Sequence, residues 1–293
     1  NITAKISGTL YAQISANIGQ SQAAIFTVPN NYVLLVANVS ATSNIHYTST
    51  IDYTYSEYNK QNLSSVINLN VLQELSERNH KLGVNQTKIF YSSSACIYPE
   101  GKQTYSDNPG LNESDAYPAN PDSEYGWEKL FSERLYATYG RIHSIQVRVA
   151  RFHNIFGPEG TWNGGREKAP AAICRKVAEA PNQGVIEIWG DGEQTRSFLY
   201  IDECLDAIDR FMLSDFQGPL NIGSEKSISI NDLVKLAATF EEKNITIKHV
   251  PGPLGVRGRN SNNDLLRSKL AFDFQQTLEE GLRKTYFWIK SQK

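Results

Sequence analysis

The chain has 293 residues, 40% of them hydrophobic, and this is enough to bury a substantial core in one or two domains. Its formal net charge of −2 gives no electrostatic reason to expect nucleic acid or an anionic membrane as a partner. The longest apolar run is too short to cross a bilayer and no charged-then-apolar leader opens the sequence, so we expect a cytoplasmic protein without membrane or nucleic-acid partners.

The cysteines indicate a chain without disulfides or a structural metal. Cys96, Cys174 and Cys204 are too few and too scattered for a disulfide framework or a zinc site. We therefore expect no metal, and free thiols in a reducing compartment.

The first part of the chain predicts strands of a buried sheet and a helix that covers it. Apolar segments at 23–28 and 32–39 are typical of buried strands, and the spacing of apolar residues over 63–75 predicts a helix packed on a sheet. Residues 88–91 predict the next buried strand, which ends in the small polar run 92–94. Ligands of open α/β sheets bind at such carboxyl ends of strands.

Downstream of this strand the segment SEYGWEKL places Tyr125 and Lys129 at positions i and i+4, on one face of a helix predicted over 125–139 with Gly140 as its C-cap. A Lys cation favours the ionised form of the nearby phenol, and the Ser94 hydroxyl can hydrogen-bond the same substrate oxygen. The spacing alone is common by chance on amphipathic helices. Together with the serine strand it indicates a proton-transfer site, and Cys96 lies two residues beyond Ser94.

The second half of the chain predicts further strands and helices. Residues 145–149 and 185–189 alternate as strands, and a helix follows Asp202. Helices with N-terminal caps are predicted after Ser229 and at the capping box that starts at Thr277.

Charged loops in this half are either solvated surface or ligand contacts. Pro170 predicts the first turn of a helix, whose free amides favour an anionic ligand, and Lys168 lies just before it. Arg257 and Arg259 could form bidentate hydrogen bonds with a diphosphate. The sequence pattern does not decide whether these charges are solvated at the surface or contact a ligand.

Several runs, read together, resemble one family. They are SSSACIYPE, SEYGWEKL, RFHNIFGP, GTWNGGREKAPAA, WGDGEQTRSF and GVRGRNSNN. The chain is identified by them as similar to the nucleotide-sugar epimerases of the extended short-chain dehydrogenase/reductase family, from about Lys88 to the C-terminus. The resemblance implies an α/β fold: a doubly wound, parallel, Rossmann-like sheet with a second, smaller substrate-binding domain. It implies an NAD-binding domain at 1–157 and a substrate domain at 158–293, with part of 184–215 returning to the first domain.

The resemblance also implies an activity. The expected reaction converts GDP-D-mannose to GDP-L-galactose by epimerisation at C3 and C5, through transient oxidation at C4 by NAD, in a homodimer. In plants such a step resembles the route to ascorbate. The catalytic residues that it implies are Ser94, Cys96, Tyr125, Lys129 and Lys168, with Cys96 and Lys168 as the acid/base pair at the sugar carbons.

The resemblance implies further contacts around the same ligands. Residues expected to bind the GDP-sugar are Ser94, Ala95, Cys96, Asn154, Glu167, Lys168, Ala169, Lys176, Gln194, Thr195, Arg196 and Arg259. Residues expected to bind NAD are Tyr125, Lys129 and Gly8.

The cofactor signature of this family is missing from the sequence. Its glycine-rich turn would fall within the first fifty residues, which contain only the glycines Gly8 and Gly19 and a single charged side chain, Lys5. Either the cofactor site is degraded, or these residues are not the natural ones of this region.

Two other functions stay open. A GDP-fucose synthase also carries a Cys-Ile-Tyr-Pro run, but it consumes NADPH and uses a His as its second acid, where this chain has Lys168. A sugar-nucleotide-binding protein that has lost NAD is consistent with the missing glycines. Retention of Tyr125, Cys96 and Lys168 favours an enzyme, because binding alone needs none of these proton-transfer groups.

Overall fold

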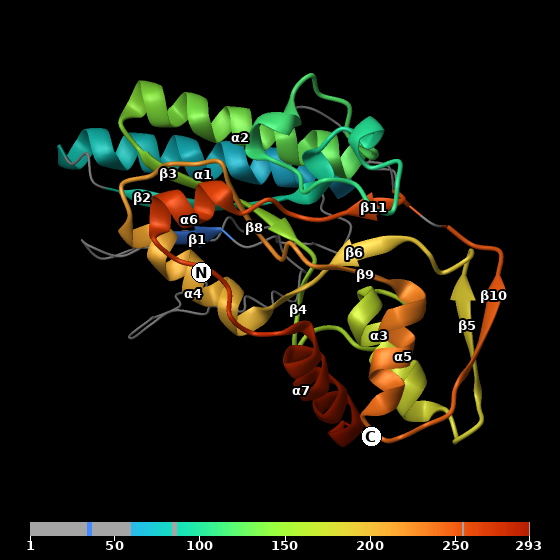
Figure 1. Ribbon diagram of the computed structural model, residues 1–293. Coiled ribbons are helices and arrows are strands. Elements are labelled where there is room, and N and C mark those ends of the chain that lie inside the picture. The colour runs from blue at the N-terminus through green and yellow to red at the C-terminus, as the bar shows by residue number, and fades with distance from the viewer. Residues whose placement is uncertain (1–33, 37–59, 84–86, 254, 293) are drawn as a thin grey trace. The chain divides into compact units, whose positions relative to one another are not determined.

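The computed structural model describes residues 34–36, 60–83, 87–253 and 255–292 (Figure 1). Gly8 and the strand predicted at 23–28 lie outside the described residues. The chain divides into two compact units, one holding residues up to 91 with 134–147, and the other holding 92–133 with 148–293. The domain boundary expected near residue 157 stays a prediction.

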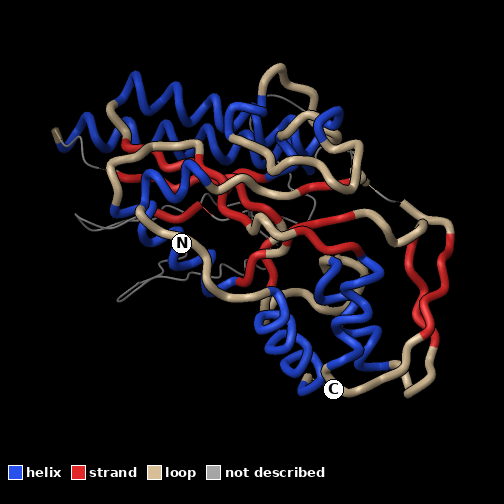
Figure 2. Tube along the Cα trace, in the orientation of Figure 1, coloured by secondary structure: helices blue, strands red, loops and turns tan. Residues whose placement is uncertain are grey.

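Helices and strands alternate along most of the described chain (Figure 2). The helices are α1 (Lys60–Leu82), α2 (Glu124–His143), α3 (Ala169–Glu179), α4 (Ile201–Leu213), α5 (Ile230–Thr239), α6 (Asp264–Leu270) and α7 (Leu278–Ser291), with short 3-10 turns η2 (Ala95–Ile97), η3 (Glu100–Lys102) and η4 (Glu113–Ala116). The strands are β1 (Leu34–Val36), β2 (Lys88–Ser94), β3 (Gln146–His153), β4 (Ile155–Phe156), β5 (Val185–Trp189), β6 (Thr195–Ser197), β7 (Leu199–Tyr200), β8 (Leu220–Gly223), β9 (Ser227–Ser229), β10 (Thr246–Val250) and β11 (Gly258–Arg259).

The largest described sheet has the strand order β1-β2-β3-β8. Strands β1 and β2 pair in parallel, as do β3 and β8. Parallel pairing with intervening helices confirms the predicted α/β class. Strand β5 pairs in parallel with β10, and α4 contacts β8. The return of part of 184–215 to the first domain stays a prediction.

In the first unit, α1 packs against the C-terminal half of α2. The Tyr136 hydroxyl donates to Asn68 at 3.1 Å, and the Tyr136 ring stacks on Tyr91 at 4.5 Å. The prediction that α2 ends at Gly140 is wrong, because the helix continues to His143. A Cβ at residue 140 would come within 3.2 Å of the Ile145 carbonyl oxygen, so this glycine allows a close approach within the fold and does not cap the helix.

In the second unit, α3, α5 and α7 share one hydrophobic core (Figure 1). The α7 side chains Leu282, Tyr286 and Ile289 are buried in this core. The predicted caps are confirmed. The Thr277 side chain accepts from the Glu280 backbone N–H in a capping box, and the Ser229 side chain accepts from the Asp232 backbone N–H.

We expect Ser229→Ala to lower the free energy of unfolding by about 1 kcal/mol, because it removes the side-chain acceptor at the N-terminus of α5. Urea unfolding followed by circular dichroism would measure the change. Ser227→Ala is the matched control, since Ser227 is exposed in β9, two residues earlier. Equal losses in the two variants would contradict a capping role.

In the part of the chain that the structure describes, none of the helices is long and apolar enough to cross a membrane. The same residues contain no cluster of His, Cys, Asp and Glu that could hold a metal ion, and all three cysteines are free thiols.

Candidate active site

The end of β2 and the turn η2 hold the predicted serine and cysteine. Ser94 is the N-cap of η2, and its hydroxyl accepts from the Cys96 backbone N–H at 3.2 Å. Ala95 and Ile97 are buried in a local core, whereas Ser94 and Cys96 are partly exposed. Buried and partly exposed residues therefore alternate along this turn. Ala95 and Ile97 anchor it, and the side chains of Ser94 and Cys96 stay accessible.

The first turns of α2 hold Tyr125 and Lys129 against this strand end. The Lys129 Nζ donates to the Ser92 carbonyl at 2.9 Å and lies 5.6 Å from the centroid of the Tyr125 ring. Gly126 permits this packing, since a Cβ there would lie 2.2 Å from the Cys96 carbonyl oxygen. The structure thus brings Ser94, Cys96, Tyr125 and Lys129 to the same strand end.

Burial changes the acid–base behaviour of Lys129, whose side chain is almost wholly enclosed. Loss of solvation lowers the pKa of Lys129 from 10.5 to about 8, against a smaller raising effect of Glu128 and Glu133. Between about pH 8 and 10.5 the unfolded chain therefore binds more protons at this residue. The contribution of Lys129 to stability is present above this window and is lost as the pH falls through about 8.

We expect any turnover at this site to slow as the pH rises through about 8, because Lys129 then loses the positive charge that supports the Tyr125 phenolate. A pH–rate profile from 6.5 to 9.5, with circular dichroism as the folding control, would measure this fall. Any activity that Lys129→Arg retains should lack the alkaline limb, because Arg stays charged throughout. A wild-type profile that is flat up to pH 9.5 would contradict the prediction.

The cation beside Cys96 is Arg259 of β11. Its Nη1 donates to the Cys96 Sγ at 3.3 Å and its Nη2 to Asp122 Oδ2 at 3.1 Å, while its Nε donates to Gln103 Oε1. The sequence suggested Arg259 as a diphosphate contact, not as a neighbour of Cys96. A buried guanidinium is therefore in direct contact with the Cys96 sulfur.

Arg196 of β6 belongs to the same electrostatic cluster. The pKa of Arg196 is lowered to about 10, chiefly by burial and next by the positive charge of Arg259, against smaller raising effects of Asp122 and Cys96. The Arg196 guanidinium also donates to the carbonyls of Thr195 and Val256, both at 2.7 Å. Two arginines near one thiol make this part of the site strongly electropositive.

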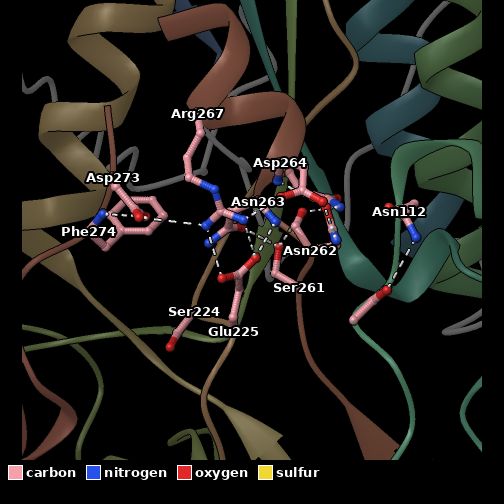
Figure 3. A network of polar contacts seen from close by, with 12 residues as sticks. Asn112, Ser224, Glu225, Ser261, Asn262, Asn263, Asp264, Arg267, Asp273 and Phe274 are labelled. Atoms are coloured by element: carbon pink, nitrogen blue, oxygen red, sulfur yellow. Dashed lines mark hydrogen bonds and ion pairs between the residues drawn. The ribbon is translucent and has the colours of Figure 1, made fainter. Parts of the chain in front are cut away.

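The loop after Arg259 is fixed by a network of polar contacts (Figure 3). The Asn263 backbone N–H donates to Glu225 Oε1 at 2.8 Å, and Arg267 binds both carboxylate oxygens of Glu225 at 3.0 Å. The Asn263 side chain donates to the Gly223 carbonyl at 2.7 Å and accepts from the Ser261 hydroxyl. This network ties the arginine loop to the end of β8, so Arg259 is held in place before any ligand binds.

Of the predicted residues around α3, Lys168 is exposed, whereas Glu167, Ala169 and Lys176 are partly buried. Lys168 is the N-cap residue of α3, with an exposed side chain that has no hydrogen-bond or ion-pair partner among the described residues. Glu167 is paired with Arg175 at 2.9 Å, and the Lys176 Nζ donates to the Glu187 carbonyl at 2.8 Å. Ala169 is the first residue of the helix. The role of Lys168 opposite Cys96 stays a prediction.

Three other predicted substrate contacts lie at strand ends of the same unit. Asn154 follows β3 with a left-handed backbone (φ 46°), and its side chain donates to the Ser197 carbonyl at 2.9 Å. Gln194 precedes β6 and is buried. Its Nε2 donates to the Trp189 carbonyl, and its Oε1 has no partner among the residues that the structure describes. The Thr195 hydroxyl donates to the Ser106 carbonyl. The unpartnered oxygen of Gln194 is the feature that most favours a ligand here.

Sequence reasoning did not single out Gln103, Asp122 or Gly126. Gln103 and Asp122 lie in irregular segments where no periodicity marks a side chain as buried or functional. Gly126 follows the predicted tyrosine, and a glycine inside a predicted helix was the available signal of a close backbone approach.

Parallel pairing in an α/β sheet, with a serine strand facing a Tyr-x-x-x-Lys helix, defines a protein of the short-chain dehydrogenase/reductase type. The chain belongs to the NAD dependent epimerase/dehydratase family, whose model matches residues 15–223.

Individual relatives are consistent with this assignment. The chain is 54% identical over 205 residues to GDP-mannose 3,5-epimerase of Arabidopsis thaliana, covering 70% of this chain and 54% of that protein. It is 53% identical over 205 residues to GDP-mannose 3,5-epimerase 1 of Oryza sativa subsp. indica, covering 70% and 53%. The chain thus spans about half the length of these relatives. A solved UDP-N-acetylglucosamine 4-epimerase from Methanobrevibacter ruminantium, in complex with UDP-N-acetylmuramic acid, is 26% identical with a TM-score of 0.68, covering 80% and 71%.

Proposed function

We propose that this protein is an NAD-dependent epimerase that converts GDP-D-mannose to GDP-L-galactose at C3 and C5. The observation that carries the proposal is the Cys96 thiol, which lies in contact with a buried guanidinium next to the Ser94, Tyr125 and Lys129 set. Similarity to the plant GDP-mannose 3,5-epimerases supports the choice of substrate.

The chain's own residues account for proton transfer at C4. The Tyr125 phenolate takes the proton of the C4 hydroxyl, and Ser94 donates a hydrogen bond to the same oxygen. Lys129 holds a buried positive charge beside the tyrosine ring and so supports the phenolate. A buried cation and a phenol at one strand end fit NAD, and Tyr125 and Lys129 would contact it. When bound, NAD supplies the hydride acceptor and donor for C4.

A carbonyl at C4 acidifies the carbon–hydrogen bonds at C3 and C5, which flank it. We assign Cys96 and Lys168 to opposite faces of the sugar, where one removes a proton and the other returns one, with inversion. The Arg259 guanidinium donates to the Cys96 sulfur, and a thiol that has taken up a proton can donate it again.

The remaining contacts are assigned to holding the GDP-sugar. Residues proposed for this role are Ala95, Asn154, Glu167, Ala169, Lys176, Gln194, Thr195, Arg196 and Arg259. The unpartnered Gln194 oxygen can accept from a base or hydroxyl group, and the adjacent Arg196 suits an anionic group. The homodimer, the cytoplasmic location and a role in ascorbate formation belong to the same proposal.

The test is incubation of the purified protein with GDP-mannose in deuterated water, followed by proton NMR. The proposal expects GDP-L-galactose and deuterium at C3 and C5, with no net change in NAD. Net consumption of NADPH would favour the GDP-fucose synthase-like alternative. Binding of GDP-mannose with neither product nor exchange would favour a binding protein without NAD.

A further inference from the structure

A buried ion pair lies directly behind the proposed site. The Arg151 guanidinium of β3 and the Glu133 carboxylate of α2 are joined by Nη2–Oε2 at 2.8 Å and Nε–Oε1 at 3.0 Å, and both side chains are at least 90% buried. The Ser93 hydroxyl also donates to Glu133 Oε1, at 2.5 Å. The carboxylate therefore binds both the strand that carries Ser94 and its neighbour in the sheet.

This carboxylate belongs to a row of contacts between the first half of α2 and the end of β2. Gly126 lies against the Cys96 carbonyl, Lys129 donates to the Ser92 carbonyl, and Glu133 accepts from Ser93. Gly126 and Glu133 are seven residues apart, about 10 Å along a helix. Contacts at these two residues fix both the position of α2 along β2 and the direction of the helix axis. Tyr125 lies at the N-terminal end of α2.

Arg151 is held from its other side as well. Its Nη1 donates to the Glu113 carbonyl at 2.7 Å and to the Tyr98 hydroxyl at 3.2 Å, and Tyr98 in turn donates to Asn221 at 2.6 Å. His153 shares the Asn221 oxygen, and burial lowers the pKa of His153 to about 3, so this ring is neutral at physiological pH. The guanidinium is thus locked within a polar network of fixed geometry.

Stability alone is a weak explanation for such a pair. Burying two charges costs about as much as their attraction returns, and replacing both by apolar side chains of similar volume is often neutral or stabilising. An ion pair does, however, impose a defined geometry on the groups that form it. Here the pair lies between the strand that carries Ser94 and the helix that carries Tyr125.

We propose that Glu133, held by Arg151, is a positioning residue that fixes α2 along β2, and thereby sets Tyr125 against Ser94 and Cys96. This inference rests on the proposed function. Glu133 does not touch the substrate; it acts through the helix that carries Tyr125 and Lys129.

The decisive variant is the double replacement Glu133→Leu with Arg151→Met, which removes both charges at similar volume. It should melt at a higher temperature than Arg151→Met alone, because it leaves no unpaired buried charge and only the Ser93 hydroxyl and the Glu113 carbonyl without these partners. Its turnover number should fall at least about 10-fold, and its KM should change less than about 3-fold. A helix shift of about an ångström misaligns the reacting groups and slows the chemical step more than it weakens substrate binding. Arg151→Met alone leaves a buried carboxylate unpaired and should lower the melting temperature strongly.

Gly126→Ala tests the same positioning from the other end of the row. The added methyl group would meet the Cys96 carbonyl, so the helix must shift, and the loss should again fall on the turnover number. The matched control is Glu187→Leu with Lys248→Met. That ion pair has the same 2.8 Å separation but is exposed between β5 and β10, so its removal should leave turnover unchanged.

A second measurement does not depend on turnover. Iodoacetamide should alkylate Cys96 several-fold faster in the Glu133/Arg151 double variant, because α2 is no longer held over the backbone of residue 96. Cys174 and Cys204 are buried and serve as internal references.

The outcomes separate the two proposals. A folded double variant with wild-type turnover and wild-type alkylation overturns the positioning role, and so does a loss confined to KM. If the wild-type protein does not epimerise GDP-mannose, the proposed function fails, and the alkylation rates alone then decide whether Glu133 positions the helix.

Discussion

Cys96→Ala is expected to abolish epimerisation and to leave GDP-mannose binding nearly intact. General acid–base groups contribute about 10²–10⁴-fold to rate, and a methyl group can neither take nor return a proton. The thiol is accessible and lies 3.3 Å from the Arg259 guanidinium, and its loss leaves the polar contacts proposed for the nucleotide in place. Deuterium incorporation at C3 and C5 by NMR, together with calorimetric titration of GDP-mannose, would measure both effects.

Cys174→Ala and Cys204→Ala are the matched controls. Both thiols are buried, in α3 and α4, and burial raises their pKa values to about 12, so neither should contribute a proton. Their turnover should equal that of wild type. Unchanged turnover in Cys96→Ala would remove this cysteine from the mechanism.

Arg259→Gln should lower kcat/KM by about 100-fold or more. The change removes the donor to the Cys96 sulfur and leaves the Asp122 carboxylate unneutralised beside it. Hydrogen bonds to charged groups contribute about 1.5–3 kcal/mol each, and two such contacts are lost. Arg259→Lys keeps the positive charge but cannot contact Cys96, Asp122 and Gln103 together in the same geometry. This variant should therefore recover only part of the activity. Steady-state kinetics, with melting temperature as the folding check, would measure the loss.

Arg257→Gln is the comparison for this prediction. Arg257 lies two residues earlier, and its ion pair with Asp191 at 2.8 Å is largely exposed, so the pair contributes about 0–1 kcal/mol. We expect its turnover number to stay close to that of wild type. Equal losses of turnover in both arginine variants would mean that contact with Cys96 is not the reason Arg259 matters.

Local patterns in the sequence predicted much of the fold. Strand β2 and the helices α3, α5 and α7 follow from apolar periodicity, an early proline and capping residues, all of which act within a few positions along the chain. Gly140 was misread, because a glycine near the end of a periodic segment is typical of a C-cap. Its actual role depends on residues 145–147, which fold back onto it.

The sequence by itself determined the serine strand, the Tyr-x-x-x-Lys helix and the cysteine two residues beyond Ser94, because each is a pattern of neighbouring residues. Only the tertiary structure decided which charges surround that cysteine and which carboxylate holds the helix. Arg259 is 163 positions from Cys96, and Arg151 is 18 from Glu133, so no local period joins these partners. Contacts of this kind form only when the strands and helices are packed, since burial and hydrogen-bond satisfaction then select which polar groups meet.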